Sequence, residues 1–251
     1  MTYVLLFDDP RAIDVAVSGG KGANLARLTQ AGFPVPPGFI ISTAAFRGSA
    51  EALPRELVAE VESLCAAAGP ARRWAVRSSG TAEDMAGAAF AGQHDTFLNC
   101  TTVHDVLRRV QDCRASLWSR RAVAYRARMR LDESRIAMAV VVQQMVIADV
   151  AGVAFTIDPV QGRLDTVVID ANFGLGESVV SGESEVDHLV VERRRWILLS
   201  KQVATKSTRV VAAESGTMAV HVSGFEARRA SLTDAQAIDI AKLAVQVEER
   251  L

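Results

Sequence analysis

The stretch WAVRSSGTAEDMAGAAFAGQHDTFLN, residues 74–99, contains the features that decide the fold. Residues 72–77 are typical of a buried strand that ends in Arg77, and a long loop of small and acidic residues follows. A guanidinium at the end of a buried strand is costly without an anion, and arginine binds phosphate through paired hydrogen bonds. The loop, with Gly80, Gly87 and Gly92, can fold over a ligand and exclude water. The stretch predicts an anion site beneath a lid; a purely structural surface loop is the alternative.

A second anion-binding pattern precedes it, VSGGKGANL at residues 17–25. Two glycines and Lys21 stand before a helix predicted over 23–30, so free N–H groups, the positive helix end and an ammonium converge. The pattern is not a Walker A loop, because Val15 stands where the first glycine belongs and Gly22 where Ser or Thr would hold a metal. A tight turn with a solvated lysine is the alternative interpretation.

Composition limits the classes of function. The chain has 251 residues, 49% hydrophobic and 23% charged, and its net charge of −1 gives no field that would recruit nucleic acid or an anionic membrane. The three cysteines form no CxxC pair and predict reduced thiols. No apolar run reaches the roughly 18 residues of a membrane span, so we expect a cytoplasmic protein. A cluster of arginines is interpreted as a solvated helix face and not as a nucleic-acid patch: Arg120, Arg121, Arg126, Arg128 and Arg130.

The remaining pattern predicts a mixed α+β organisation. Helical spacing occupies residues 51–68 and 103–130, and a strand is predicted over 38–43. A final helix starts at Thr233, which can form a capping box with Gln236. The composition shift near Gln144 divides the chain into lobes 1–143 and 144–251. The apolar segments of the second half predict a mostly antiparallel sheet, and they lie at 136–146, 150–157, 165–171 and 188–200.

Five motifs occur in order along the chain: GGKGANLARLTQAGFPVPPGFIIST (19–43), the stretch 74–99, VVQQMV (141–146), GVAFTIDPV (152–160) and GLGESVVSG (174–182). Together they resemble the ATP-binding domain shared by phosphoenolpyruvate synthase, pyruvate phosphate dikinase and rifampicin phosphotransferase. This resemblance implies an α+β ATP-grasp fold, with the nucleotide in the cleft between two lobes. It also implies cleavage of ATP to AMP and phosphate, with the β-phosphoryl passing to a histidine and then to pyruvate or an antibiotic hydroxyl. The motif at 174–182 is not a dinucleotide fingerprint, since Val179 replaces its third glycine.

The resemblance implies site residues at matching positions. Lys21 and Arg77 match the phosphate-binding, catalytic cations, and residues 78–93 match the lid, with Gly92 and Thr96 at its closing end. Glu177 matches a position near the nucleotide. The hinge strand that receives adenine matches Gln143, Gln144, Met145 and Val146. The implied cofactors are ATP and Mg²⁺.

Two further family features have no match in these residues. They are a Gly-x-Pro-Gln-Asp-Ile-Glu-Trp segment, whose acids bind magnesium, and a swivelling phosphohistidine domain with a Thr-Ser-His element. We therefore expect that domain, and a small-molecule acceptor, as partners, and the metal ligands stay unassigned. None of the four histidines, His94, His104, His188 and His221, matches the expected acceptor. A stand-alone ATP-grasp kinase and a non-catalytic nucleotide-binding module remain as alternatives.

Overall fold

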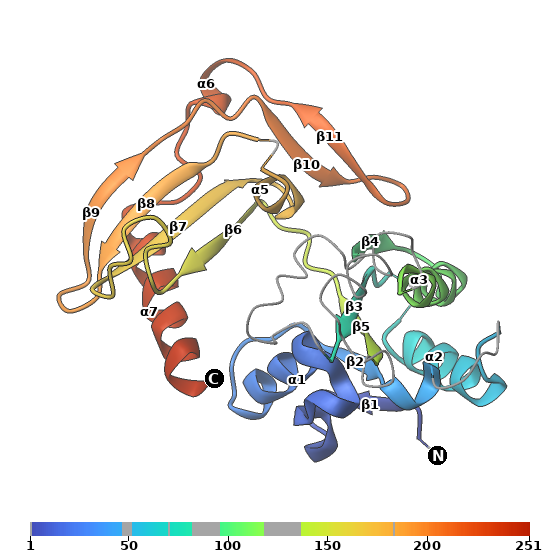
Figure 1. Cartoon of the computed structure of the whole chain (residues 1–251). Coiled ribbons are helices and arrows are strands. Elements are labelled where there is room, and N and C mark those ends of the chain that lie inside the picture. Colours follow the sequence, from blue (N-terminus) through green and yellow to red (C-terminus); the bar gives the residue numbers. More distant parts are fainter. Residues whose placement is uncertain (1, 47–51, 70, 82–95, 118–136, 183) are drawn as a thin grey trace. The chain divides into compact units, whose positions relative to one another are not determined.

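The computed structural model describes residues 2–46, 52–69, 71–81, 96–117, 137–182 and 184–251. The chain divides into two compact units, Met1–Met145 and Val146–Leu251, and Figure 1 shows their elements. The sequence placed the boundary between residues 143 and 144. The two units are described in turn.

The first unit is built on a five-stranded, fully antiparallel sheet. Its strand order is β1-β2-β5-β3-β4, so β5 lies in the middle and pairs with both β2 and β3. The strands are β1 (Val4–Leu6), β2 (Gly38–Ile41), β3 (Trp74–Gly80), β4 (Thr96–Cys100) and β5 (Met138–Gln144).

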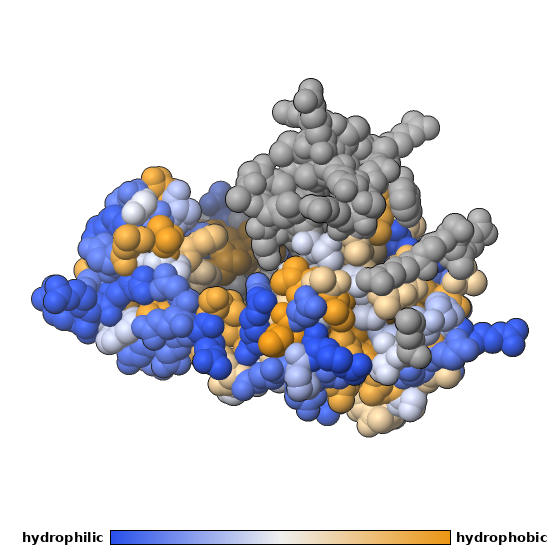
Figure 2. Space-filling model, turned by 60° about the horizontal axis from the view of Figure 1, so that its bottom comes forward, coloured by the Kyte–Doolittle hydropathy of each residue, from blue (hydrophilic) through white to orange (hydrophobic). Residues whose placement is uncertain are grey.

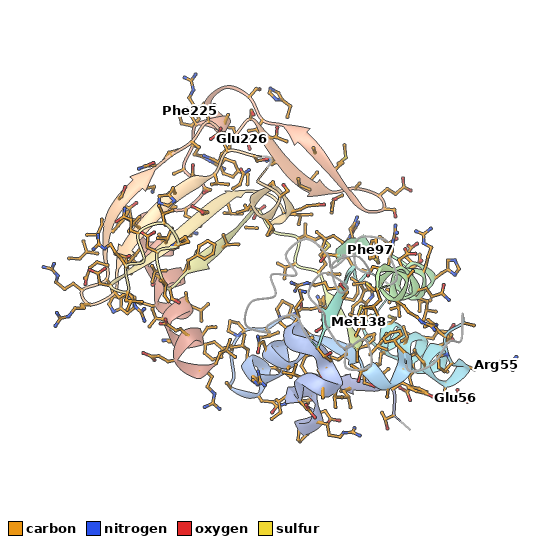
Figure 3. The ribbon with its side chains drawn as sticks, in the orientation of Figure 1. Arg55, Glu56, Phe97, Met138, Phe225 and Glu226 are labelled. Carbon is orange, nitrogen blue, oxygen red and sulfur yellow. The ribbon has the colours of Figure 1, made fainter. Side chains whose placement is uncertain are left out.

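Alternation along β5 explains why both faces of this sheet are covered. Met138, Val140 and Val142 belong to one core cluster, while Ala139 and Val141 belong to another. The first cluster packs under α2 (Arg55–Ala67) and α3 (Val103–Ser116), and Figure 3 marks Met138 there. The second packs under α1 (Val15–Gln30), where Ala26 is fully buried. The unit therefore has three layers, with the sheet between α1 and the pair α2 and α3.

The second unit is an antiparallel sheet of order β6-β7-β8-β9 with one helix packed on it. Val167, Ile169 and Ala171 alternate toward α7, which presents the small residues Ala237 and Ala241. The elements are β6 (Val150–Phe155), β7 (Thr166–Phe173), α5 (Glu177–Val180), β8 (Asp187–Glu192), β9 (Ile197–Gln202), the hairpin β10 (Thr208–Ala212) and β11 (Thr217–His221), α6 (Gly224–Ala227) and α7 (Asp234–Arg250). The Thr233–Gln236 capping box at the start of α7 is confirmed.

Several predicted elements differ from those observed. The segment 136–146 was grouped with the second half, but β5 pairs with strands of the first unit. A β-branched, apolar run identifies a strand and not its partners. The segment 188–200 is two strands, β8 and β9, joined by a turn in which Trp196 has φ 57°. The strand predicted over 72–77 starts and ends later, at Trp74 and Gly80.

Two helices also have other bounds than predicted. α1 begins at Val15 and not Ala23, because the Asp14 side chain accepts a hydrogen bond from the Ala16 N–H at 2.9 Å and caps it. α3 confirms the helical pattern from Val103 to Ser116. The predicted continuation to residue 130, with its arginines, lies outside the described residues.

Candidate functional site

Arg77 and Thr96 lie opposite each other in the first unit. Arg77 is paired with Thr96 of β4 on one side and with Val141 of β5 on the other. Directly opposed residues of antiparallel strands present their side chains on the same face, about 5 Å apart. Val141 belongs to the core cluster under α1, so Arg77 and Thr96 are on the α1 face of the sheet.

The Arg77 guanidinium is half-buried and has no ion pair or hydrogen bond to another residue of the described ranges. Burial lowers the pKa of Arg77 from its usual value, which reflects the cost of holding this charge away from water. A cation placed in this way gains most from an anionic ligand that can accept two of its N–H groups.

The glycine-rich turn of α1 lies directly against β3. Gly19 interrupts the helix with φ 66° and ψ 174°, a conformation essentially restricted to glycine. A Cβ at Gly19 would stand 2.2 Å from the Ser79 carbonyl oxygen. Lys21 follows the break, and its Nζ donates to the Ser78 carbonyl oxygen at 3.3 Å. The ammonium is therefore held beside the strand residue that follows Arg77.

The segment from Gln143 to Met145 is anchored by its own hydrogen bonds. The Gln143 side chain is buried, and its Nε2 donates to the Pro36 carbonyl oxygen at 3.0 Å. The N–H of Gln144 donates to Pro37 O and that of Met145 donates to Arg73 O, both at 2.8 Å. These bonds fix the path of the chain after β5 and occupy two of the backbone N–H groups.

Met145 and Val146 have opposite surroundings. Met145 is buried, and its Sδ accepts the N–H of Asn99 at 3.1 Å. Asn99 has φ 58° and lies where β4 carries an extra residue opposite β3. Val146 is 60% exposed, and within the described part of the chain its N–H has no hydrogen-bond partner. Of the four hinge positions, Val146 thus combines an accessible apolar side chain with an available donor.

Glu177 belongs to the second unit, at the start of α5. Its exposed carboxylate accepts the Thr217 hydroxyl of β11 at 2.8 Å. In the same unit, His188 Nδ1 lies 2.7 Å from Asp170 Oδ1 across β7 and β8. His104 and His221 are exposed.

Some candidates cannot be placed. Gly92, His94 and residues 82–93 of the lid lie outside the described residues. Within the described ranges, no group of three or more His, Cys, Asp or Glu side chains is arranged to hold a metal ion. The same residues contain no helix that is both long and apolar enough to cross a membrane. The three cysteines are free and buried.

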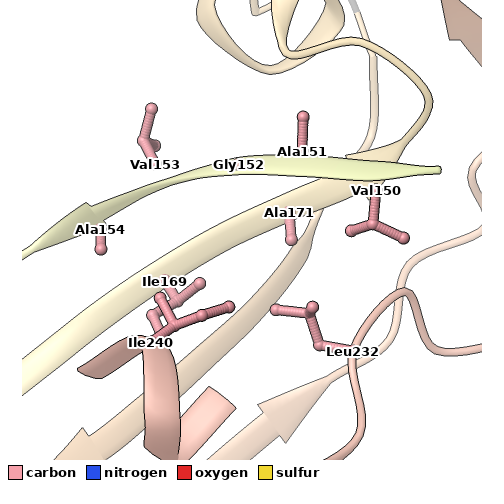
Figure 4. Close-up of a pocket in the computed structure, with 9 residues that line it drawn as sticks. All are labelled: Val150, Ala151, Gly152, Val153, Ala154, Ile169, Ala171, Leu232 and Ile240. Carbon is pink, nitrogen blue, oxygen red and sulfur yellow. The ribbon is translucent and has the colours of Figure 1, made fainter. Parts of the chain in front are cut away.

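A cavity of about 150 Å³ lies elsewhere, beside β6 in the second unit. Figure 4 shows its lining, which consists of Val, Ala, Gly, Leu and Ile residues and includes Ile240 of α7. None of these side chains is polar, so the cavity has no side chain that could bind a phosphate. On the face that Figure 2 presents, hydrophobic and hydrophilic residues are interspersed over the coloured surface. The cations of the α1–β3 junction, and not this cavity, define the candidate anion site.

The fold and the junction define an α+β protein in which two cations, Lys21 and Arg77, are presented by one helix–strand contact. The chain belongs to the family of the pyruvate phosphate dikinase AMP/ATP-binding domain, whose model matches residues 48–251.

Curated relatives agree with this family. A probable phosphoenolpyruvate synthase of Methanocaldococcus jannaschii is 34% identical, over 99% of this chain and 25% of its own length. A rifampicin phosphotransferase of Streptomyces sviceus is 36% identical, over 99% of this chain and 33% of its own. A phosphoenolpyruvate synthase of Pyrococcus furiosus is 30% identical, over 98% of this chain and 40% of its own. The chain thus spans a quarter to two-fifths of the length of these relatives.

Sequence reasoning missed two residues, one at the α1–β3 junction and one beside the hinge segment. Ser79 contacts the turn of α1, and Asn99 holds Met145. Serine and asparagine are common in loops and at strand ends, so neither carries a sequence signal of its own. Their roles arise from contacts between residues 46 to 61 positions apart.

Proposed function

We propose that this chain is the ATP-binding part of a dikinase-type phosphotransferase with an ATP-grasp arrangement. The observation that carries the proposal is the α1–β3 junction, where the Lys21 ammonium is bonded to Ser78 O and the Arg77 guanidinium is half-buried. Two cations in a partly dry site compensate the charge of a triphosphate more strongly than they would in water.

Each residue then has a defined task. Arg77 binds phosphate oxygens in a bidentate manner, and Lys21 supplies a second positive charge at the start of a helical segment. Thr96, opposite Arg77, offers a hydroxyl to the same phosphates. Val146 provides an N–H and an apolar surface to adenine, while Gly92 closes the lid.

We propose Mg²⁺ as the second cofactor, because a divalent cation compensates phosphate charge in phosphoryl transfer. Glu177, an exposed carboxylate, is the site residue whose oxygens suit this metal. With no cluster of three ligating side chains in the described ranges, we assign no ligand set.

The reaction that we propose splits ATP into AMP and phosphate and passes the β-phosphoryl through a phosphohistidine to a small-molecule acceptor. The histidine belongs to a swivelling domain, either elsewhere in a longer polypeptide or on another chain. Relatives named phosphoenolpyruvate synthase and rifampicin phosphotransferase support pyruvate or an antibiotic hydroxyl as the acceptor.

Calorimetric titration of the chain with ATP, GTP and adenosine tests the nucleotide site. We expect ATP to bind more tightly than GTP and adenosine. Lys21→Ala or Arg77→Ala should each remove a charge-assisted contact of about 1.5–3 kcal/mol and weaken ATP binding roughly ten- to a hundredfold. Adenosine binding should stay unchanged.

Arg163→Ala is the matched control, because it removes an exposed arginine of the second unit that is paired with Asp165 at 2.9 Å. It should leave both affinities unchanged. Equal binding of ATP and GTP, or no binding of either at millimolar concentration, would contradict the proposed adenine-nucleotide site. If both cation variants weakened adenosine as much as ATP, the phosphate assignment would be wrong.

A further inference from the structure

The Ser79 hydroxyl is inserted into the hydrogen-bond ladder of α1. Its Oγ donates to the Ser18 carbonyl oxygen at 2.9 Å and accepts the Gly22 N–H at 3.1 Å. Residues 18 and 22 are four apart, so in an uninterrupted helix this N–H would donate directly to this carbonyl. The break at Gly19 opens that bond, and a side chain from β3 bridges it.

The residues at both ends of this hydrogen-bond bridge are buried from water. The side chains of Ser18 and Ser79 are fully buried, and Gly22 is buried as well. The approach is close, since a Cβ at Gly19 would stand 2.4 Å from Ser79 Oγ. A buried N–H and a buried carbonyl thus both depend on one hydroxyl, and each would be costly to leave unpaired.

The bridge links the two segments that carry the cations of the candidate site. Ser79 is two residues after Arg77, so both side chains are on the α1 face of β3. Lys21 lies between Ser18 and Gly22, the two residues that the Ser79 hydroxyl bridges, and its Nζ donates to Ser78 O. The hydroxyl therefore fixes the turn that carries Lys21 against the strand that carries Arg77.

We propose that Ser79 is a positioning residue that sets the Lys21 ammonium relative to the Arg77 guanidinium for binding one polyphosphate. This inference rests on the proposed function and extends it to a residue that contacts neither adenine nor phosphate. Without the bridge, the turn would shift, and the two cations would not engage the same ligand together.

The test compares Ser79→Ala with Ser42→Ala in the 251-residue chain. Ser42 follows β2 and is 3% exposed, and its hydroxyl has no hydrogen-bond partner in the described ranges. Ser42→Ala therefore removes a buried hydroxyl, as Ser79→Ala does, but breaks no hydrogen-bond bridge. The quantity to compare is the ratio of the adenosine Kd to the ATP Kd. Ser79→Ala should lower this ratio about tenfold with the adenosine Kd within twofold of wild type, and Ser42→Ala should change neither.

Amide hydrogen exchange supplies a readout that does not depend on ligand. In Ser79→Ala, exchange at the Gly22 amide should accelerate at least tenfold relative to wild type, while Ser42→Ala leaves it unchanged. Where Ser79→Ala does not fold, Ser79→Cys keeps one donor and one acceptor at this position, both weaker than those of the hydroxyl, and it should lower the ratio by a smaller factor.

The outcomes separate this inference from the proposed function. If wild type bound adenosine as tightly as ATP, the proposed function would fail, whatever the exchange showed. If wild type favoured ATP and Lys21→Ala removed that preference while Ser79→Ala kept it in full, Ser79 would support only the fold. The positioning role would then be wrong and the nucleotide site would stand.

Discussion

Single residues of the candidate site differ in how much of their role can be predicted from the sequence. Lys21 and Arg77 carry charge beside glycines or at a strand end, and this chemistry is visible in the sequence. Ser79 acts through Ser18 and Gly22, 61 and 57 residues away, so its role depends on how closely β3 approaches α1. Gln143 was predicted for the hinge, but its buried side chain is bonded to Pro36 O, a contact that no local pattern indicates.

Gly19→Ala should destabilise the first unit by about 3 kcal/mol or more. The new Cβ would lie 2.2 Å from Ser79 O. The backbone at residue 19, with φ 66° and ψ 174°, is also strained for any L-residue. Gly32→Ala is the matched control, because φ is also positive there, at 83°, but a Cβ meets nothing within 4 Å. It should cost only about 1–2 kcal/mol. Urea unfolding measures both, and equal losses would contradict the close approach.

At the scale of elements, hydrophobic patterning predicted most of the helices and strands but not which strands pair. The apolar, β-branched run of β5 identified a strand, whereas its place between β2 and β3 comes from pairing with residues 38–41 and 74–80. β8 and β9 read as one segment, because a turn of charged residues and Trp196 lacks the glycine or proline that marks most turns. Capping chemistry was more reliable, since Thr233 and Gln236 satisfy each other locally.

A buried ion pair joins three segments of the second unit. Asp187, the first residue of β8, accepts Lys206 Nζ at 2.6 Å, the Ala204 N–H at 2.9 Å and the Ser231 N–H and hydroxyl at 2.6 and 2.7 Å. Lys206 also lies 5.2 Å from the centre of the Phe173 ring. Both charged side chains are almost completely buried, so each depends on the other for compensation.

Lys206→Met should therefore destabilise the chain by about 3–5 kcal/mol, because it leaves the Asp187 carboxylate buried without its cation. Arg163→Ala breaks the exposed pair with Asp165 in the same unit and should cost less than about 1 kcal/mol. Chemical denaturation followed by far-UV circular dichroism compares the two. A loss of under 1 kcal/mol in Lys206→Met would show that the pair contributes nothing beyond packing.

For the whole molecule, the family was accessible from sequence because five motifs occur in order, and residues 48–251 match the family model. The complete reaction could not be predicted from the sequence, because the chain spans only a quarter to two-fifths of the length of its relatives. Acceptor choice depends on residues that bind the acceptor, and no motif in this chain identifies them. A lid over residues 78–93 was predicted from glycines and small residues, but residues 78–80 belong to β3, and residues 82–93 lie outside the described residues.

The isolated 251-residue chain should bind ATP without sustained turnover. Phosphoryl transfer requires an acceptor held in line and metal-compensated charge, and the described residues include no cluster of metal-ligating side chains. AMP should stay near background when the chain is incubated with ATP, Mg²⁺ and either pyruvate or a rifamycin, as followed by chromatography. Adding the two parts that the family resemblance implies, the acidic metal-binding segment and the swivelling domain, should produce AMP and an acid-labile phosphohistidine on the swivelling domain. Sustained AMP formation by the chain alone would favour the stand-alone kinase.

The two units should respond to pH at opposite ends of the scale. Burial raises the pKa of Cys65 and Cys100, in the first unit, from 9.0 to about 11. These thiols stabilise the fold fully below their unfolded pKa, and this contribution, about 3 kcal/mol each, is lost as pH rises through 9 to 11. In the second unit, burial raises the pKa of Asp187, but hydrogen bonds from Lys206 and Ser231 outweigh it and lower the pKa below 3.8. Its contribution is present above pH 3.8 and is lost as pH falls through the lower, folded value.

Hydrogen exchange can assign each loss of stability to its unit. The chain is exposed briefly to the other pH values, and exchange is then measured at pH 7 by mass spectrometry. Peptides around Cys65 and Cys100 should lose protection first after exposure to pH 10–11, and peptides of β8 and residues 204–207 first after exposure below pH 3.8.

Variants give the controls. Cys65→Ala with Cys100→Ala should be less stable at pH 8 yet lose less stability between pH 9 and 11, because the two buried thiols with raised pKa values are no longer there to ionise. Asp187→Asn should be destabilised at pH 7 and lose less between pH 4 and 2. A wild-type chain whose alkaline loss began in the second unit, or an unchanged alkaline slope in the cysteine variant, would show that other groups control the response.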